Sequence, residues 1–182
     1  MYPDGRYEVQ LFNGVNTINI LPISGYYAAC EPTFTVDSEV GAPLPKTSLV
    51  QIKEDCPFME VNIISFAGEP CKETVYFLEY SNKGTIAAEN AYIDLQMDYR
   101  LQVGEIDLPY TDLGNNHFRF ELGSVPAGTQ KLVFIYGKIP CDLSEEETLR
   151  HEANIFPNEI CGSINQNWSG ASLDVDLSLI HI

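Results

Sequence analysis

Residues 74–95, TVYFLEYSNKGTIAAENAYIDL, constrain the fold of this chain more than any other stretch. Large side chains alternate between two faces over residues 75–80, and the same period of two returns over residues 91–96. Such alternation, with β-branched and aromatic residues, is typical of strands that bury one face. Residues 82–84, Asn-Lys-Gly, tolerate the positive φ that a turn requires. The stretch therefore predicts a hairpin of a β-sandwich.

The rest of the chain predicts an all-β protein, since short alternating or apolar segments recur between turn signals. Asn13-Gly14 predicts a tight hairpin between the first two of these segments. Residues 144–147, SEEE, fit a capping box ahead of Leu149 and predict a helix of about two turns. The further predicted strands cover residues 5–11, 17–21, 33–36, 48–52, 59–63, 101–110, 118–122, 131–136, 152–156 and 171–179.

The charged, proline-containing segment KEDCP at residues 53–57 predicts a domain boundary. Residues 55–182 then form an immunoglobulin-like β-sandwich, and residues 1–54 form a smaller, partial β-sandwich module before it. A β-module of fewer than about 60 residues buries little surface and usually needs help to be stable.

The net charge narrows the range of partners. The chain has 26 acidic and 10 basic residues, a formal charge of −16. A field of this sign repels nucleic acid and anionic membranes, and no apolar run is long enough to insert into a membrane. The first residues lack the features of a signal peptide, so the chain is either cytosolic or a piece of a longer secreted protein.

Five cysteines are present, and none forms a Cys-x-x-Cys pair. Because the three histidines are also scattered, a zinc site has little support. Disulfides among Cys56, Cys71, Cys141 and Cys161 would place the chain in an oxidising compartment. Buried free thiols are the alternative. Cys30 has no obvious partner.

No catalytic constellation is predicted. A Gly-x-Ser-x-Gly elbow is absent, and His151-Glu152 lacks a second histidine four positions on, where Ile155 stands. Calcium is the one metal with support, because carboxylates in several loops suit a hard cation. No EF-hand spacing occurs, and solvated surface charge is the preferred interpretation of these carboxylates. The calcium candidates are Asp4, Asp37, Glu39 and Asp112.

Three aromatic residues could stack on a sugar ring: Trp168, Tyr26 and Tyr27. Packing over the edge of the core is the alternative, and for Trp168 the preferred one. Residues 167–169, Asn-Trp-Ser, formally match a glycosylation sequon. In a bacterial protein they would simply form the turn before the last strand.

Two segments carry a resemblance to known families. YFLEYSNKGTIAAENAYIDLQMDYRLQV, followed by FRFELGSVPAGTQKLVFI with its Leu-Gly-x-x-x-x-Gly turn at residues 122–128, resembles the repeat-type β-sandwich domain DUF11. DCPFMEVNI and HEANIFPNEICGSINQNWSGASLDVD are similar to versions of this domain in very large surface proteins of Bacteroidota. Residues 4–22 resemble the end of a prealbumin-like module, similar to the B-type repeats of serine-aspartate adhesins.

The resemblance implies a non-enzymatic structural segment of a large extracellular protein, a building block of an adhesin, fibre or cell-surface appendage. Its partners would be adjacent modules of the same chain. A glycan- or cell-binding module acting through its loops is the alternative, and an accessory domain of a secreted hydrolase is a third. An open sheet edge in the first module can accept a strand from another chain, which predicts a homo-oligomer or filament.

Overall fold

The computed structural model describes residues 9–22, 25–38, 47–66, 68–144, 147–158 and 170–176, and every helix or strand within them is a β-strand. The predicted all-β class is confirmed. No helix in the described ranges is long and apolar enough to cross a membrane. The strands are β1 Gly14–Asn19, β2 Tyr27–Ala29, β3 Thr33–Ser38, β4 Val50–Ile52, β5 Met59–Ser65, β6 Glu73–Asn82, β7 Ala88–Gln96, β8 Gln102–Ile106, β9 Thr111–Gly114, β10 His117–Val125, β11 Gln130–Lys138, β12 Thr148–Phe156 and β13 Gly170–Asp176.

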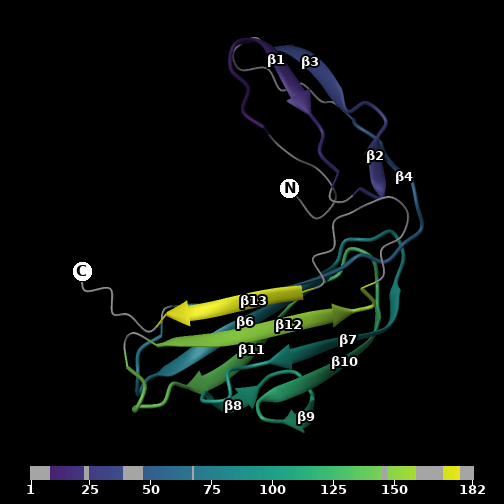
Figure 1. The fold of residues 1–182 in the computed structure, drawn as a ribbon. Helices are drawn as coiled ribbons and strands as arrows, with labels where there is room; N and C mark the ends of the chain where they lie inside the picture. Colours follow the sequence, from purple (N-terminus) through teal and green to yellow (C-terminus); the bar gives the residue numbers. More distant parts are fainter. Residues whose placement is uncertain are drawn as a thin grey trace. The chain divides into compact units, whose positions relative to one another are not determined.

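The chain divides into two compact units, Met1–Lys53 and Glu54–Ile182. The boundary predicted from the sequence, between residues 54 and 55, lies one residue further along the chain. In the first unit, β1 pairs with β3 and β2 pairs with β4, so its described strands form two separate two-stranded sheets (Figure 1).

The hairpin predicted at Asn13-Gly14 is wrong. Gly14 begins β1 with a φ of 104°, and the strand partner of β1 is β3, with Gly14 opposite Ser38 and Asn19 opposite Thr33. Two side-chain hydrogen bonds clamp the entry to β1: Ser38 Oγ donates to Phe12 O at 2.6 Å, and Asn16 Nδ2 donates to the same oxygen at 2.7 Å. Of the strand predicted over residues 5–11, residues 9–11 are not in a strand, and residues 5–8 lie outside the described ranges.

The second unit is a β-sandwich of two antiparallel sheets (Figure 1). One sheet has the order β13-β12-β7-β10-β9, and the other has the order β5-β6-β11-β8. The inner faces of both sheets supply one continuous hydrophobic core. Each large apolar side chain that is fully buried in such a core contributes roughly 1.5–3 kcal/mol. The predicted sandwich is therefore confirmed.

The structure decides which face of β6 is buried. Tyr76, Leu78 and Tyr80 point into the core, opposite Ala91, Ile93 and Leu95 of β7. The residues between them in the sequence lie on the opposite face of each strand, as expected for a period of two. Both strands predicted within residues 74–95 are present.

The predicted hairpin between these two strands is wrong, however. β6 pairs with β5 and β11, whereas β7 pairs with β10 and β12, so the connection crosses from one sheet to the other. Gly84 in this connection does not have a positive φ. A Cβ added to Gly84 would lie 2.2 Å from the backbone oxygen of Cys56, so the glycine is required by close contact of two backbones.

Asn82 holds the crossover in place from inside. Its side chain is fully buried and makes four hydrogen bonds, two donated and two accepted. Nδ2 donates to Ile86 O and Val125 O, both at 2.9 Å. Oδ1 accepts from the N–H groups of Phe58 at 3.1 Å and Gly84 at 2.9 Å. All four hydrogen-bonding positions of the buried amide are thus used, which avoids the cost of an unpaired polar group.

The predicted helix after Ser144 is also wrong, because Leu149 lies in β12. The capping contact itself forms: the Ser144 N–H donates to Glu147 Oε2 at 2.7 Å. Leu149, His151, Ala153 and Ile155 are buried at alternate positions, so the period of two in the following residues outweighs the local helix signal.

Candidate functional site

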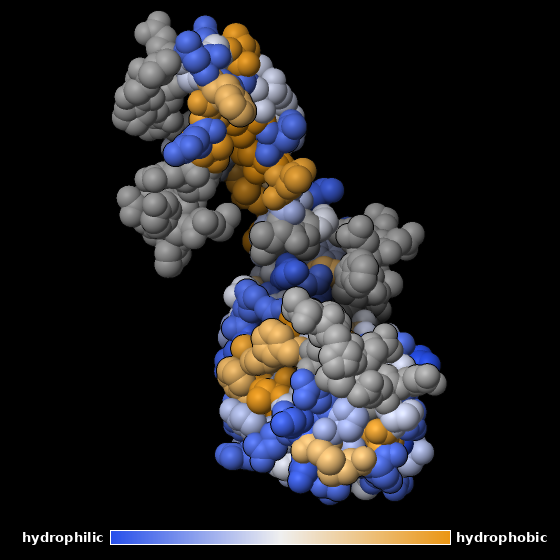
Figure 2. Space-filling model, turned by 90° about the vertical axis from the view of Figure 1, so that its left-hand side faces the viewer, coloured by the Kyte–Doolittle hydropathy of each residue, from blue (hydrophilic) through white to orange (hydrophobic). Residues whose placement is uncertain are grey.

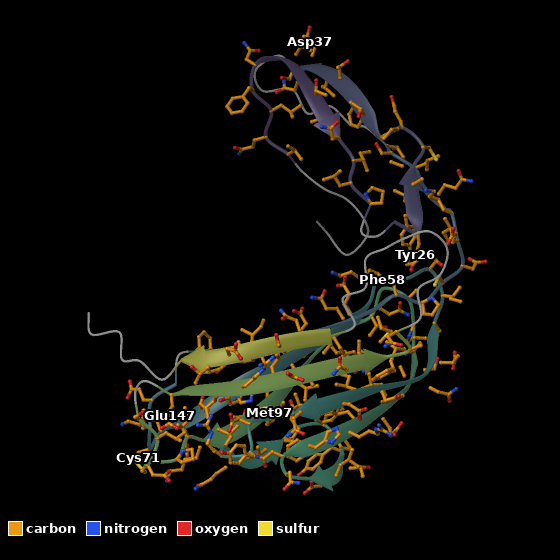
Figure 3. All side chains as sticks on the ribbon, in the orientation of Figure 1. Tyr26, Asp37, Phe58, Cys71, Met97 and Glu147 are labelled. Carbon is orange, nitrogen blue, oxygen red and sulfur yellow. A yellow bond between two sulfur atoms is a disulfide. The ribbon has the colours of Figure 1, made fainter. Side chains whose placement is uncertain are left out.

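A disulfide joins Cys71 to Cys141, seventy residues apart in the sequence. The closed loop contains β6 to β11, that is, six of the strands of the sandwich. Two backbone hydrogen bonds flank the bridge, from the Cys71 N–H to Ile139 O at 3.1 Å and from the Ile139 N–H to Lys72 O at 2.9 Å. Figure 3 labels Cys71 at the edge of the sandwich. The bridge is consistent with an oxidising, extracellular compartment.

The other cysteines differ in state. Cys56 is buried and disulfide-bonded. Cys161, a predicted disulfide residue, lies outside the described residues. Cys30 in the first unit is an exposed free thiol.

The first residues of the sandwich are attached to the β6–β7 crossover. The Cys56 N–H donates to Thr85 Oγ1 at 2.8 Å, and Thr85 Oγ1 donates to Glu54 O at 2.7 Å. Backbone bonds from Thr85 N–H to Cys56 O and from Lys83 N–H to Phe58 O, both 2.8 Å, complete the contact. Hydrogen bonds to the crossover therefore hold the point where the chain enters the sandwich, in addition to the pairing of β5.

An apolar surface covers part of the outer side of the four-stranded sheet, and we call it the outer aromatic face. In register, Phe77 of β6 lies between Ile64 of β5 and Phe134 of β11. Phe66 and Phe134 both contact the Phe77 ring edge to face, with centroids 5.6 and 5.4 Å away. Phe66 is 73% exposed. The full set is Ile64, Phe66, Val75, Phe77, Leu132, Phe134 and Tyr136.

The sequence predicts no site on this face. Both faces of residues 75–80 carry large apolar side chains, and this pattern in the sequence could have identified the outer aromatic face. On the face drawn in Figure 2, apolar patches interrupt the hydrophilic surface of the lower unit. Contiguous exposed apolar surface on a soluble domain commonly marks a contact site.

A polar groove of about 730 Å³ lies beside this face, toward the Glu79 end of β6. Lys83 forms an ion pair with Glu60, and the uncharged Gln130 amide donates a hydrogen bond to Glu79. The remaining lining includes Asn62 and residues 170–172 of β13. Among these lining residues, the Lys83 charge is used by Glu60, and Glu79 keeps its negative charge.

The outer side of the five-stranded sheet carries a stacked group of side chains. The ring of Tyr92 stacks on Phe156 with centroids 4.6 Å apart, and the Arg119 guanidinium lies 4.6 Å from the Tyr92 centroid. Arg119 also forms two hydrogen bonds with the Asp94 carboxylate, at 2.7 and 2.8 Å. The Tyr92 ring and the Arg119 guanidinium are therefore in contact with each other and with neighbouring side chains of the same sheet.

A polar network is buried at the end of β7. The Asp98 carboxylate accepts hydrogen bonds from the Arg100 side chain, 2.9 Å to each oxygen, and from the N–H groups of Arg100 and Arg150 at 3.0 and 3.1 Å. Burial raises the pKa of Asp98, but these hydrogen bonds outweigh it and lower the pKa to about 2. The same contact raises the pKa of Arg100. Arg100 also binds Glu147 at 3.0 Å and Thr148 O at 2.7 Å, so it ties the start of β12 to the end of β7.

His151 belongs to the same network and is fully buried. Its Nδ1 accepts the Asp98 N–H at 3.1 Å, and its ring meets Tyr76 edge to face with centroids 4.6 Å apart. Burial lowers the pKa of His151 to about 4, although the Asp98 charge opposes this shift. Neutral imidazole and ionised carboxylate therefore coexist at neutral pH. Because neither Tyr76 nor His151 is exposed, the network couples pH to stability and offers no contact to a substrate.

The four predicted calcium residues come from three separate segments of the sequence, and the structure describes two of these residues. Asp37 lies in β3 of the first unit, and Asp112 lies in β9 of the second, where its Oδ1 accepts the Gly114 N–H at 2.8 Å. Asp4 and Glu39 lie outside the described residues. Within the described ranges, no three or more His, Cys, Asp or Glu residues gather in a way that could hold a metal ion. Calcium binding stays a prediction.

The aromatic residues considered for sugar stacking have different positions. Tyr26 is 1% exposed, which agrees with core packing and leaves no ring face for a sugar. Tyr27 is half-buried in β2, and its register partner is Ile52. Trp168 and the sequon at residues 167–169 lie outside the described ranges.

No family model matches the chain, and no curated protein matches it. Among solved structures, it is similar to the CARDB domain of a Pyrococcus furiosus protein, with 16% identity, a TM-score of 0.48, and coverage of 69% of this chain and 97% of that domain. It is similar to the seventh ScaB type I cohesin of Pseudobacteroides cellulosolvens, with 12% identity, a TM-score of 0.47, and coverage of 69% and 96%. The collagen-binding subdomain of the Enterococcus faecalis surface protein ACE gives 14% identity, a TM-score of 0.41, and coverage of 66% and 95%.

Proposed function

We propose that this chain is a non-enzymatic structural segment of an extracellular surface protein, a building block of an adhesin, fibre or appendage. The observation that supports this most is the Cys71–Cys141 bridge, which encloses β6 to β11. Persistent disulfides form in oxidising compartments and are rare in the cytosol. The resemblance to DUF11 and to a prealbumin-like module points to the same class of protein.

Such a segment would transmit tension between its neighbours, and its construction suits that task. A chain pulled at both ends cannot extend the residues inside a closed disulfide loop. The contact of Cys56 and Glu54 with Thr85 anchors the entry to the sandwich at the point where tension arrives. The buried amide of Asn82 fixes the crossover next to it.

Thiol trapping on protein taken from its native source tests the proposal. Intact cells are treated with a membrane-impermeant alkylating reagent before lysis and a second reagent after reduction. We expect Cys30 to react first, with Cys56, Cys71 and Cys141 protected until reduction. Labelling of all of these cysteines without reductant, or of none before lysis, would contradict an extracellular structural role.

A binding module is the second candidate, and the outer aromatic face favours contact through a sheet and not through loops. The edge-to-face arrangement of Phe66, Phe77 and Phe134 gives no single flat platform for a sugar ring. It suits a protein surface better than a glycan. Phe66→Ser should weaken attachment of the full protein to its target surface if this candidate is correct, and unchanged attachment would count against it.

A further inference from the structure

The entry to β1 contains the single Asn-Gly pair of the sequence, Asn13-Gly14. Asparagine is chemically labile, because the backbone nitrogen of the next residue can attack its side-chain amide. A side chain on that next residue hinders the attack, and glycine has none. Every other asparagine of the chain precedes a residue with a Cβ. The sequence therefore makes Asn13 the asparagine most open to this reaction.

The structure leaves the reacting atoms accessible. Asn13 is exposed, and the nearby side chains of Phe12 and Val15 are 87% and 74% exposed. A Cβ added to Gly14 would meet no described atom within 4 Å, and the Gly14 φ of 104° is one that favours glycine. Among the described residues, none forms a hydrogen bond with the Asn13 side chain. Nothing in the described part of the first unit therefore shields the Asn13 amide.

The carbonyl groups on either side of Asn13 are held by the same two side chains, and we call this arrangement the entry clamp. Phe12 O accepts hydrogen bonds from Ser38 Oγ at 2.6 Å and from Asn16 Nδ2 at 2.7 Å. Asn16 Nδ2 also donates to Gly14 O at 2.8 Å and lies 3.0 Å from Ser38 Oγ. Both carbonyl groups can meet these donors only if the backbone between them keeps its present length.

We propose that Asn13 is a site of spontaneous deamidation and that its isoaspartate product opens the entry clamp. Hydroxide takes the proton of the Gly14 N–H, and the nitrogen forms a bond to Asn13 Cγ. The bond from Cγ to Nδ2 breaks, and the side-chain nitrogen leaves as ammonia after taking a proton from water. Water then opens the cyclic imide. Rupture of its bond from nitrogen to Cγ gives aspartate, whereas rupture of its bond from nitrogen to the backbone carbonyl carbon gives isoaspartate.

The two products differ in their effect on the clamp. Both carry a new carboxylate, but in isoaspartate the main chain runs through Cβ and Cγ, so one more atom separates the Phe12 and Gly14 carbonyl groups. Asn16 and Ser38 then cannot bind both groups in their present positions. Among the described strands, β1 pairs with β3 only, and a two-stranded sheet is marginally stable in water. Loss of the clamp therefore loosens the start of β1.

Peptide mapping by mass spectrometry tests the modification on the full chain, incubated at neutral and at mildly alkaline pH. Asn19 is the internal control, because it is exposed at the other end of β1 and precedes the β-branched Ile20. We expect the mass gain of an amide converted to an acid at Asn13, on the order of tenfold or more faster than at Asn19 and faster at the higher pH. Asn13→Gln should suppress it, since the longer side chain would have to close a larger ring. Equal rates at Asn13 and Asn19, or no conversion at Asn13, would overturn the proposal.

Hydrogen exchange then tests the effect on the clamp. Asn13→Asp is the matched control, because it adds the carboxylate without lengthening the backbone. We expect the amides of β1 to exchange faster in the isoaspartate form than in Asn13→Asp or in the unmodified chain. The same exchange in all three would show that the clamp survives and would overturn this part of the proposal. Neither measurement depends on the cysteines, so this proposal and the thiol-trapping result fail separately.

Discussion

Removal of the Cys71–Cys141 bridge should change how far the chain extends under force. The bridge spans a separation of seventy residues. At about 3.6 Å per extended residue, the enclosed chain represents roughly 250 Å of contour length that tension cannot reach while the bridge is intact. Because Cys56 is also disulfide-bonded, it must be replaced in every variant to isolate the loop between Cys71 and Cys141.

The comparison is therefore between Cys30→Ser/Cys56→Ser and the same chain that also carries Cys71→Ser and Cys141→Ser. Single-molecule stretching from handles at both termini should give a total contour length about 250 Å longer for the second variant. Equal lengths for the two variants would refute the reasoning, because they would mean that the loop is not closed.

The same pair of variants predicts an equilibrium effect. Closing a loop of this length removes about 4 kcal/mol of conformational entropy from the unfolded chain in the loop-entropy estimate. Cys71 and Cys141 are both exposed, so serine in their place removes little packing. Urea denaturation should show a loss of free energy of unfolding of that order, and a loss below about 1 kcal/mol would contradict the estimate.

Three further predictions follow from buried contacts. Burial holds the folded pKa of His151 at about 4, below the unfolded value of about 6.5. The contribution of His151 to stability is therefore fully present above pH 6.5 and falls by up to about 3 kcal/mol as the pH drops from 6.5 to 4. In His151→Gln, the free energy of unfolding from urea titrations should depend less on pH between 6.5 and 4 than it does in wild type. The same pH dependence in both proteins would count against this role of His151. Gly84→Ala should cost about 3 kcal/mol or more, because a Cβ at this position would lie 2.2 Å from the Cys56 backbone oxygen. Gly104→Ala, whose Cβ would lie 3.4 Å from its nearest neighbour, should cost about 1 kcal/mol, and equal losses in chemical denaturation would be incompatible with the close approach at Gly84. Phe120→Ala should cost about 3–5 kcal/mol and Phe66→Ser less than about 1, and the reverse order of midpoints would mean that the two faces are assigned wrongly.

Much of the sandwich is predictable from local pattern. The alternation in residues 75–80 and 91–96 identifies two strands and separates their faces, because side chains in a strand point to opposite sides. The same rule explains why the helix expected near Leu149 is absent. A capping contact of a few residues is weaker than an alternating segment that buries four side chains in a core.

The candidate sites are less predictable because they depend on pairs of residues that are distant in the chain. Asp98 and His151 are 53 residues apart, and nothing near either of them in the sequence indicates a buried hydrogen bond. The outer aromatic face requires Phe77 to lie between β5 and β11, which follows from strand order and register. The role of Gly84 likewise depends on the backbone of Cys56, 28 residues earlier.

The sequence by itself determined the class of this protein: period-two alternation, turn residues and an acidic composition are local properties that specify strands and a soluble surface. Only the tertiary structure decided which strands pair, which face of β6 is buried, and that its connection to β7 crosses between sheets. The physical reason is that backbone hydrogen bonding satisfies a strand equally well with many partners. The choice among them is made by packing of the whole core, by buried groups such as Asn82, and by close contacts that no short window of sequence contains.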